Sequence, residues 1–492
     1  MKGNWKWPHL MWFLGVAKQP KVTRRKPLPV RIQKRSFSVR SKGNWRIAFG
    51  PEKLTSFAGL ELVHRFVRGG GLFSALKKAE QRLRLGGDLR FSSSVLLIVG
   101  MLLVGARRLR HVGYVQNEPM LERFSGIAHV PKERTLSRKL KQLGRPAWRE
   151  LDTLAFGLFS ASLAPKELPR LTLDMDGSVI STGQKVGYAT RGYNPHKRKN
   201  PSYYPLAICV AQTGHVVAHH NRTGAVHDSR NAAKILRGCV HRLRNEMHYR
   251  GIIEVRTDAA FFTREHFDAC DKLSLEYAAK VPMWSWLNLK STIAGLAPDK
   301  WHSVSESAGV DGACVSLTVK SWKRTLQVAI YRTRRSHQPK KGVQLDLFNP
   351  DDGFWEYSVV ATNKTLGLAA LWNFMNGRGV QEKVFAELKS GYAYDCVPTN
   401  NYRANTAWQK LNILAHNLMT SMQLATTATT KRPSAKRTRS FLVKTIRTIR
   451  FEWLTRAARL TRTNGIRSLR LVDSPEIRKV YDAIESGLAA AA

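Results

Sequence analysis

The chain has 492 residues, of which 43% are hydrophobic, so it can bury a sizeable core in roughly two to four domains. Lysine and arginine number 81 against 35 aspartates and glutamates, which gives a formal net charge of +46. The length and hydrophobic content argue against the short, basic ribosomal or histone-like class, and this charge excess calls for a polyanionic partner. The composition therefore predicts an enzyme that works on nucleic acid, with an anionic membrane surface as the alternative partner.

Residues 1–45 are predicted to be a basic, poorly ordered arm. Its start faintly resembles a signal peptide, but Pro8 and His9 interrupt the apolar part and a basic tract follows. The five cysteines form no CxxC pair, which fits a reducing cytoplasm. The apolar run 95–106 is only about 12 residues long, so we expect a buried helix and no membrane association.

Residues 46–165 are predicted to form a helical DNA-binding domain, because apolar residues recur there at i, i+3 and i+4. Near its end, Pro131 is placed to open a helix that Gly144 closes. Arg138 and Lys139 would give this helix a basic surface that resembles the recognition helix of a helix-turn-helix protein. An ordinary solvated helix face explains the same pattern about as well.

Strand-like runs begin at residue 171, where apolar and polar residues alternate up to Asp176. Two apolar runs separated by residues 212–214 come next in a hairpin pattern, and another apolar strand ends at Asp258. Three more strand-like runs lie in 291–369. A basic linker then precedes an arginine-rich segment whose alternation fits either short strands or a basic helix.

Three acidic residues stand where a metal site needs them. Asp176 and Asp258 each end a strand, and Glu382 lies on a predicted helix that would pack beside them. Three carboxylates are hard oxygen ligands that suit Mg²⁺ or Mn²⁺, which can activate an attacking water or hydroxyl in phosphoryl transfer. An Asp after a strand is also a common turn former or helix N-cap, so the combination carries more weight than each residue. Asp174 and Glu387 are the rival first and third acids.

Glu382 belongs to an Arg378-x3-Glu382-x6-Lys389 pattern. On an α-helix the three side chains lie within about 40° of one another around the helix axis. The cations could hold a phosphate backbone beside the carboxylate, although Glu382 could also be a simple i, i+4 partner of Arg378.

These motifs resemble those of DDE transposases of bacterial insertion sequences, in the group with a Tyr-x2-Arg-x3-Glu-x6-Lys signature. LDMDGSV is similar to its first-Asp motif, VRTDAAFF to its second-Asp strand, and ANTAWQKLNILAHNL to the helix after the Glu. The resemblance covers roughly residues 46–475. It implies that the three acids are the catalytic metal ligands and that Arg378 and Lys389 contact phosphates at the transposon end. Met375 replaces the signature tyrosine, so a hydrogen bond to phosphate is lost there or shifts to a neighbour.

The resemblance also implies the fold. We expect an α/β, RNase H-like mixed-sheet catalytic core over 166–290 and 370–425, with a β-rich insertion over 291–369 between the second Asp and the Glu. The helical N-terminal domain and a basic C-terminal region, 426–492, would flank this core. Such insertions supply an aromatic side chain that stacks on a flipped base, for which Trp355 is the candidate and Trp322 the runner-up.

The implied function is cut-and-paste transposition. Metal-dependent cleavage at the insertion-sequence ends would free hydroxyls that attack target DNA, with a hairpin as intermediate. The expected partners are double-stranded DNA, as terminal inverted repeats and target, and a second copy of the chain in a homodimeric synaptic complex. The expected location is the cytoplasm, associated with the nucleoid. The alternatives are a catalytically inactive, transposase-derived DNA-binding protein or repressor, which Met375 favours, and a metal-dependent nuclease without strand transfer.

Overall fold

A computed structural model of the chain describes residues 50, 52–195, 197–334, 355–430 and 440–491. The arm expected over residues 1–45 lies outside these ranges. The described residues from 52 onward form one compact unit, which contains all of the described helices and strands.

The first part of this unit is helical. A short strand, β1, is followed by six α-helices (β1 Leu54–Thr55, α1 Leu60–Gly69, α2 Leu72–Leu83, α3 Phe91–Leu103, α4 Pro119–Ser125, α5 Glu133–Gln142, α6 Arg145–Leu163). Helix α3 contains most of the apolar run predicted to be a buried helix, and all of its side chains except Ser93 are buried. Among the described helices, none is long and apolar enough to cross a membrane.

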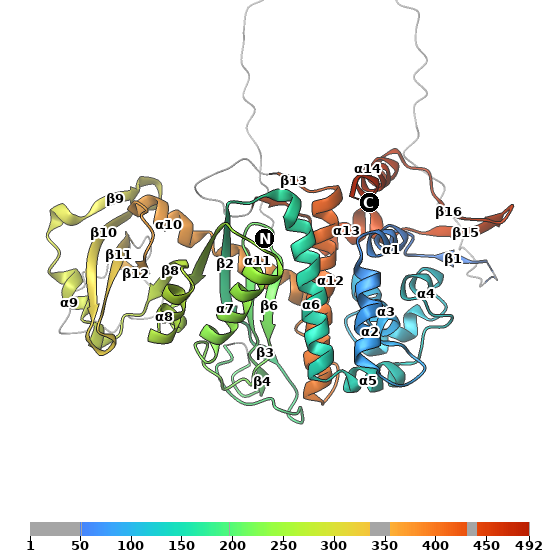
Figure 1. Cartoon of the computed structure of the whole chain (residues 1–492), viewed down its shortest axis with the longest axis horizontal. Helices are drawn as coiled ribbons and strands as arrows, with labels where there is room; N and C mark the ends of the chain where they lie inside the picture. The colour runs from blue at the N-terminus through green and yellow to red at the C-terminus, as the bar shows by residue number, and fades with distance from the viewer. Residues whose placement is uncertain (1–49, 51, 196, 335–354, 431–439, 492) are drawn as a thin grey trace, which may run out of the picture. The chain divides into compact units, whose positions relative to one another are not determined.

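A nine-stranded mixed sheet comes next, in the order β6-β5-β2-β7-β8-β12-β11-β10-β9. Its strands are β2 Arg170–Gly177, β5 Leu206–Val210, β6 Val216–His220, β7 Ile252–Thr257, β8 Glu276–Val281, β9 His302–Ser305, β10 Val310–Val319, β11 Arg324–Arg334 and β12 Trp355–Thr362. Strands β2, β7 and β8 are parallel, whereas β5 is antiparallel to both β2 and β6. The first five strands thus have the order and directions of the expected RNase H-like core. Figure 1 labels β6, β2 and β8 among them.

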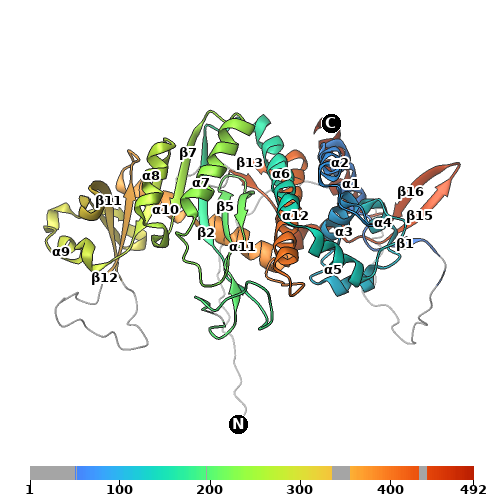
Figure 2. The same ribbon diagram turned by 60° about the horizontal axis from the view of Figure 1, so that its bottom comes forward.

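The β-rich insertion continues the core sheet. Strand β12 pairs with β8 in antiparallel register from Val359 opposite Val281 to Thr362 opposite Ala278. The sheet therefore runs without interruption from the core strands into the insertion strands, as Figure 2 also shows. Helices α8 (Arg264–Lys272) and α9 (Leu289–Ala294) lie between β7 and β9 in the chain, and α7 (Ala232–His241) precedes β7.

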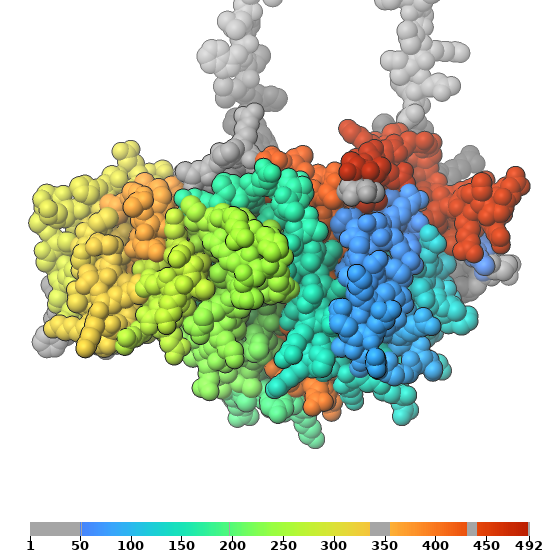
Figure 3. Space-filling model, in the orientation of Figure 1, coloured from blue at the N-terminus to red at the C-terminus, as the bar shows by residue number. Residues whose placement is uncertain are grey.

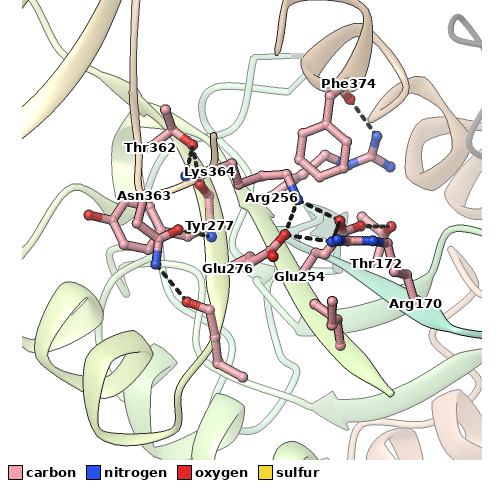
Figure 4. A network of polar contacts seen from close by, with 12 residues as sticks. Arg170, Thr172, Glu254, Arg256, Glu276, Tyr277, Thr362, Asn363, Lys364 and Phe374 are labelled. Carbon is pink, nitrogen blue, oxygen red and sulfur yellow. Dashed lines mark hydrogen bonds and ion pairs between the residues drawn. The ribbon is translucent and has the colours of Figure 1, made fainter. Parts of the chain in front are cut away.

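An ion-pair network links β7, β8 and the segment after β12 (Figure 4). The buried ammonium of Lys364 contacts the carboxylates of both Glu254 and Glu276. Arg170 Nη1 contacts the same two carboxylates, at 2.9 and 2.7 Å. Because a group of alternating charges ties four backbone segments together, the register between core and insertion is held by side chains as well as by the strand ladder.

Two consecutive helices come after the insertion and lead to a third that is central to the fold. Helices α10 (Leu368–Asn376) and α11 (Gly379–Tyr392) precede α12 (Tyr402–Thr426), whose side chains are almost all buried. Helix α12 packs most extensively on α6, and it also contacts α3, α5, α11 and β6. Lys410 Nζ contacts Asp152 of α6 at 2.6 Å, and the Asn417 amide donates to the carbonyls of both Ala155 and Val216. Helix α12 therefore joins the helical part to the sheet.

The C-terminal part returns to the N-terminal helices. It contains a small strand pair, a short helix, a β-hairpin and a final helix (β13 Thr429–Thr430, β14 Phe441–Leu442, α13 Ile446–Ile449, β15 Ala458–Thr463, β16 Ile466–Leu471, α14 Pro475–Ala491). Another small strand pair, β3 Ile180–Ser181 and β4 Ser202–Tyr203, lies earlier in the chain, between β2 and β5. The predicted linker is bounded by β13 and β14, which pair with each other, and 431–439 lie outside the described residues. Helix α14 contacts α1 and α12, so the two ends of this unit are packed together (Figure 3).

Candidate active site

Asp176 and Asp258 lie side by side at one edge of the sheet. In the parallel β2–β7 ladder Asp174 is opposite Arg256, so the residues two positions on, Asp176 and Asp258, are also neighbours. Asp176 is the penultimate residue of β2, and Asp258 comes directly after β7, where its carboxylate accepts from the N–H of Ala259. Carboxyl ends of parallel strands in α/β sheets commonly form ligand sites.

One guanidinium bridges these two carboxylates. Arg378, at the N-cap of α11, places Nη2 2.8 Å from Asp176 Oδ2 and Nη1 3.2 Å from Asp258 Oδ2. Its side chain is only 13% exposed. The contact of Nη2 is an ion pair without hydrogen-bond geometry, and neither Nη2 nor Nε has a hydrogen-bond acceptor in the described structure. The fold thus gathers two anions around one cation whose hydrogen-bonding capacity is only partly used.

The two carboxylates titrate differently. Burial raises the pKa of Asp176 to about 6; Arg378 opposes this shift, and the charges of Asp228 and Asp258 add to it. Burial also acts to raise the pKa of Asp258, but Arg378 and the N–H of Ala259 outweigh it and leave that pKa below its ordinary value. Asp258 is therefore the more readily ionised member of the pair.

A third carboxylate, Asp228, lies beside this pair and was missed by sequence reasoning. Its Oδ2 accepts from the Tyr204 hydroxyl at 2.8 Å, and Arg222 lies 3.5 Å from its Oδ1. A Cβ added to Gly177 would lie 2.3 Å from Asp228 Oδ1, so the close approach of this carboxylate requires glycine after Asp176. Its sequence surroundings, HDSRN before a helix, indicate only a helix start, which is why the position carried no signal.

Glu382 is not brought to the other two acids in this structure. It lies in the first turn of α11, one turn beyond Arg378, and is exposed. Within the described ranges, no three Asp, Glu, His or Cys side chains form a group that could hold a metal ion. The guanidinium of Arg378 takes the place between the two aspartates, so the predicted three-acid set is only partly assembled.

Both rival acids have other partners. Asp174 is fully buried, and its two oxygens accept from Arg256 Nε at 2.7 Å and Nη2 at 2.8 Å. Glu387 accepts from the backbone N–H of Ile446 at 2.9 Å and so fixes the start of α13. Met375 is buried in an apolar cluster with residues of β11 and β12. At the place of the signature tyrosine this chain therefore has a packing residue.

The residues predicted to contact DNA occupy different settings. Lys389 is half-buried on α11, and burial lowers its pKa. Trp355 begins β12, and the Arg332 guanidinium lies 4.5 Å from its ring centroid, so one ring face is already in contact with a cation. Trp322, the runner-up, packs against Phe262 with a centroid separation of 4.8 Å.

A pair of exposed tryptophans near Asp258 was also missed. Trp284 and Trp286 come after β8, are 43% and 52% exposed, and stack on each other with ring centroids 5.5 Å apart. Trp284 also contacts Phe262, four residues after Asp258, with ring centroids 6.1 Å apart. Because β7 and β8 are parallel, this aromatic pair lies at the same edge of the sheet as the acids. The signal available in the sequence was two tryptophans two residues apart after a short strand.

In α5 the structure separates the two predicted basic residues. Arg138 is exposed, on a face that it shares with Arg134 and Lys141. Lys139 is 4% exposed, and its ammonium donates to the carbonyl oxygen of Gly86 at 3.2 Å. The prediction that Lys139 belongs to the basic surface of this helix is therefore wrong, because the side chain turns inward.

The raised pKa of Asp176 predicts that Asp176→Asn stabilises the metal-free protein. The ionised carboxylate destabilises the folded chain above about pH 6, and this cost is absent below the ordinary pKa of 3.8. In thermal unfolding with a chelator, the free energy of unfolding of the variant should exceed that of the wild type by an amount that grows from pH 3.8 to about pH 6. This difference should reach at most about 2–3 kcal/mol and stay constant at higher pH. Asp258→Asn is the matched control: since the pKa of Asp258 is lowered, that variant should lose stability at neutral pH and recover it in acid. A pH-independent difference for both variants would contradict the assignment.

The sequence and the fold were also compared with known proteins. No curated protein matches the sequence. A cryo-EM structure of a piggyBac transposase synaptic complex with hairpin DNA is similar at 12% identity and a TM-score of 0.37, over 88% of this chain and 85% of that one. A likeness at that level carries no residue assignments. The family model described as "Transposase DDE domain group 1" matches residues 37–491, which is most of the sequence. The chain therefore belongs to this transposase family.

Proposed function

We propose that this transposase cleaves phosphodiester bonds at the ends of its mobile element and joins the freed 3′ hydroxyls to target DNA. The observation that carries the proposal is the Arg378-bridged pair of Asp176 and Asp258, at the carboxyl ends of parallel strands in a chain of this family. Basic residues near the pair supply the charge that a phosphate backbone requires.

The chemistry of the site suits Mg²⁺ or Mn²⁺ as cofactor. Asp176 and Asp258 offer oxygen donors, which these hard cations prefer, and both already lie beside one cationic group. Glu382 would complete the set from the first turn of α11, where it has no ion pair among the described residues. When bound, the metal would activate the attacking oxygen and stabilise the leaving oxygen.

The cations of α11 would position the DNA strand. Arg378 has nitrogen atoms without acceptors, and a phosphate oxygen is a suitable one. Lys389 lies 11 residues further on, about 16 Å along the helix, so it would contact a more distant phosphate. Arg138 on α5 and Trp355 on β12 remain candidates for contacts to the end sequence and to a base. The partners would be double-stranded DNA and a second copy of the chain in the synaptic complex, and the site of action the nucleoid.

The proposal is tested by cleavage and strand transfer on a labelled duplex that carries the element's own end, in Mg²⁺, with wild type and Glu382→Gln. We expect hairpin and joined products from the wild type only, and equal binding of the duplex by both proteins. Equal cutting by both proteins would remove Glu382 from the metal set. Cut but unjoined products would support a nuclease without strand transfer.

A binding-only protein is the second candidate, and Met375 is the observation that favours it. Its buried thioether cannot donate a hydrogen bond to a phosphate, so one contact of the signature is missing. The discriminating result is duplex binding by the wild type without any cleavage. Met375→Tyr would then be expected to restore cutting if this single contact limits the reaction.

A further inference from the structure

The hairpin β15–β16 has a register fixed by its turn. Asn464 and Gly465 connect the strands, and both have positive φ, 50° and 79°, as a two-residue hairpin turn requires. The ladder runs from Thr463 opposite Ile466 back to Ala458 opposite Leu471. At its base β15 also pairs with β1. The ribbon is therefore anchored at one end, and its loop end extends from the helices in both Figure 1 and Figure 2.

This register places like charges opposite each other twice. Arg459 is opposite Arg470, and Arg462 is opposite Arg467. All four side chains are exposed, and no ion pair is found for them within the described ranges. Like charges directly opposite each other destabilise a strand pair. A ribbon built at this cost indicates a polyanionic partner that neutralises the four cations.

The two arginine pairs lie on opposite faces of the ribbon. Residues 459 and 462 are separated by an odd number of positions, and side chains alternate between the faces of a strand. A flat anionic surface, such as a membrane, would meet only one face. A groove with phosphate walls on both sides would meet both faces.

The thickness of the ribbon selects the groove. A strand layer with its side chains is about 10 Å thick, the spacing between packed sheets. The major groove of DNA is about 12 Å wide and the minor groove about 6 Å. We propose that β15–β16 enters the major groove of DNA, with Arg459 and Arg470 facing one phosphate chain and Arg462 and Arg467 the other. This inference rests on the proposed function and adds to it a second DNA contact, separate from the acids.

The loop end has the chemistry to meet base edges. Residues 462–468 are all exposed, and among them Ile466 is 69% exposed. An asparagine side chain can bond adenine in the major groove, and an apolar side chain can contact a thymine methyl group. Asn464 and Ile466 would therefore favour A·T pairs at the point of entry.

The test is equilibrium binding of the full chain to a fluorescein-labelled, mixed-sequence DNA duplex over a range of salt concentrations. Each phosphate contact contributes about 0.9 to the slope of log K against log salt. Arg462→Gln with Arg467→Gln should lower the slope by about 1.8, and Arg459→Gln with Arg470→Gln should do the same. Arg478→Gln is the matched control, because this exposed arginine is already paired with Asp473 at 2.8 Å, and its slope should equal that of the wild type.

Two further measurements separate the alternatives. Methyl green, which occupies the major groove, should compete with the protein, whereas netropsin, which occupies the minor groove, should not. The Tm of both double variants should equal or exceed that of the wild type, since like-charge contacts are removed. Unchanged slopes with normal wild-type binding would overturn the hairpin inference and leave the proposed function standing. Competition by netropsin alone, or preferential binding to phosphatidylserine vesicles, would also overturn the inference. A wild type without DNA affinity would overturn both.

Discussion

Asp258→Asn and Asp176→Asn are each expected to lower end cleavage by at least about 10³-fold while leaving DNA affinity within about twofold. Asparagine keeps the size of the side chain but removes the negative charge that a divalent cation requires. A thousandfold loss corresponds to about 4 kcal/mol of transition-state stabilisation, which is the scale of a metal contact. DNA affinity is retained because the exposed arginines and lysines lie elsewhere in the chain.

The measurement is single-turnover cleavage of the labelled end, with gel-shift titration of the same duplex as the binding readout. Asp268→Asn is the matched control, because this half-exposed carboxylate on α8 pairs with Arg264 and Arg324, which are not part of the candidate site. It should cleave at the wild-type rate. A wild-type cleavage rate in either site variant would remove that residue from the metal set, and joint loss of cleavage and binding would indicate a folding defect.

Arg256→Met is expected to destabilise the protein by about 3–5 kcal/mol. Arg256 and Asp174 are both completely buried in the middle of the sheet, and Arg256 Nη1 also donates to the carbonyl of Phe374 at 2.6 Å. Figure 4 shows this guanidinium directed at Phe374, just before the α10–α11 junction. Removal of the cation leaves the Asp174 carboxylate without its partner in a nonpolar interior, which is among the most costly single changes in a protein.

The matched variant combines Arg256→Met with Asp174→Leu. Replacement of both members of a buried ion pair by apolar residues is often close to neutral, so this double variant should recover most of the lost stability. Urea unfolding at neutral pH compares the free energy of unfolding of both variants with that of the wild type. If the single and double variants lose equal amounts of unfolding free energy, the loss comes from packing around Arg256 and not from the unpaired charge of Asp174.

The fold was predictable where local pattern and burial agree. The alternation from residue 171 and the hairpin around 212–214 correspond to β2, β5 and β6, and the apolar run 95–106 corresponds to α3. The acids at the ends of two strands were predictable because each strand has its own apolar signal. Their adjacency follows from the parallel β2–β7 ladder, which no single segment of the sequence carries.

Long-range contacts account for what sequence reasoning missed. The inward turn of Lys139 depends on a carbonyl 53 positions away, at Gly86. Asp228 reaches the site only because β5 and β6 bring its loop beside Gly177. The C-terminal arginines recur at spacings that fit a strand or a helix equally, and the Asn464-Gly465 turn decides between them.

Helix α12 also limits how this chain can be divided or recombined. It is 25 residues long, about 37 Å, and is buried along almost its whole length, chiefly against α6, α5 and α3. A fragment cut between the helical part and the sheet would expose an apolar flank of this helix or leave α6 without its partner. The helical part therefore cannot be exchanged as a separate module without disturbing the packing of α12. A recombinant of two relatives would also have to keep a compatible pair at positions 152 and 410, because the Lys410 ammonium lies 2.6 Å from the Asp152 carboxylate.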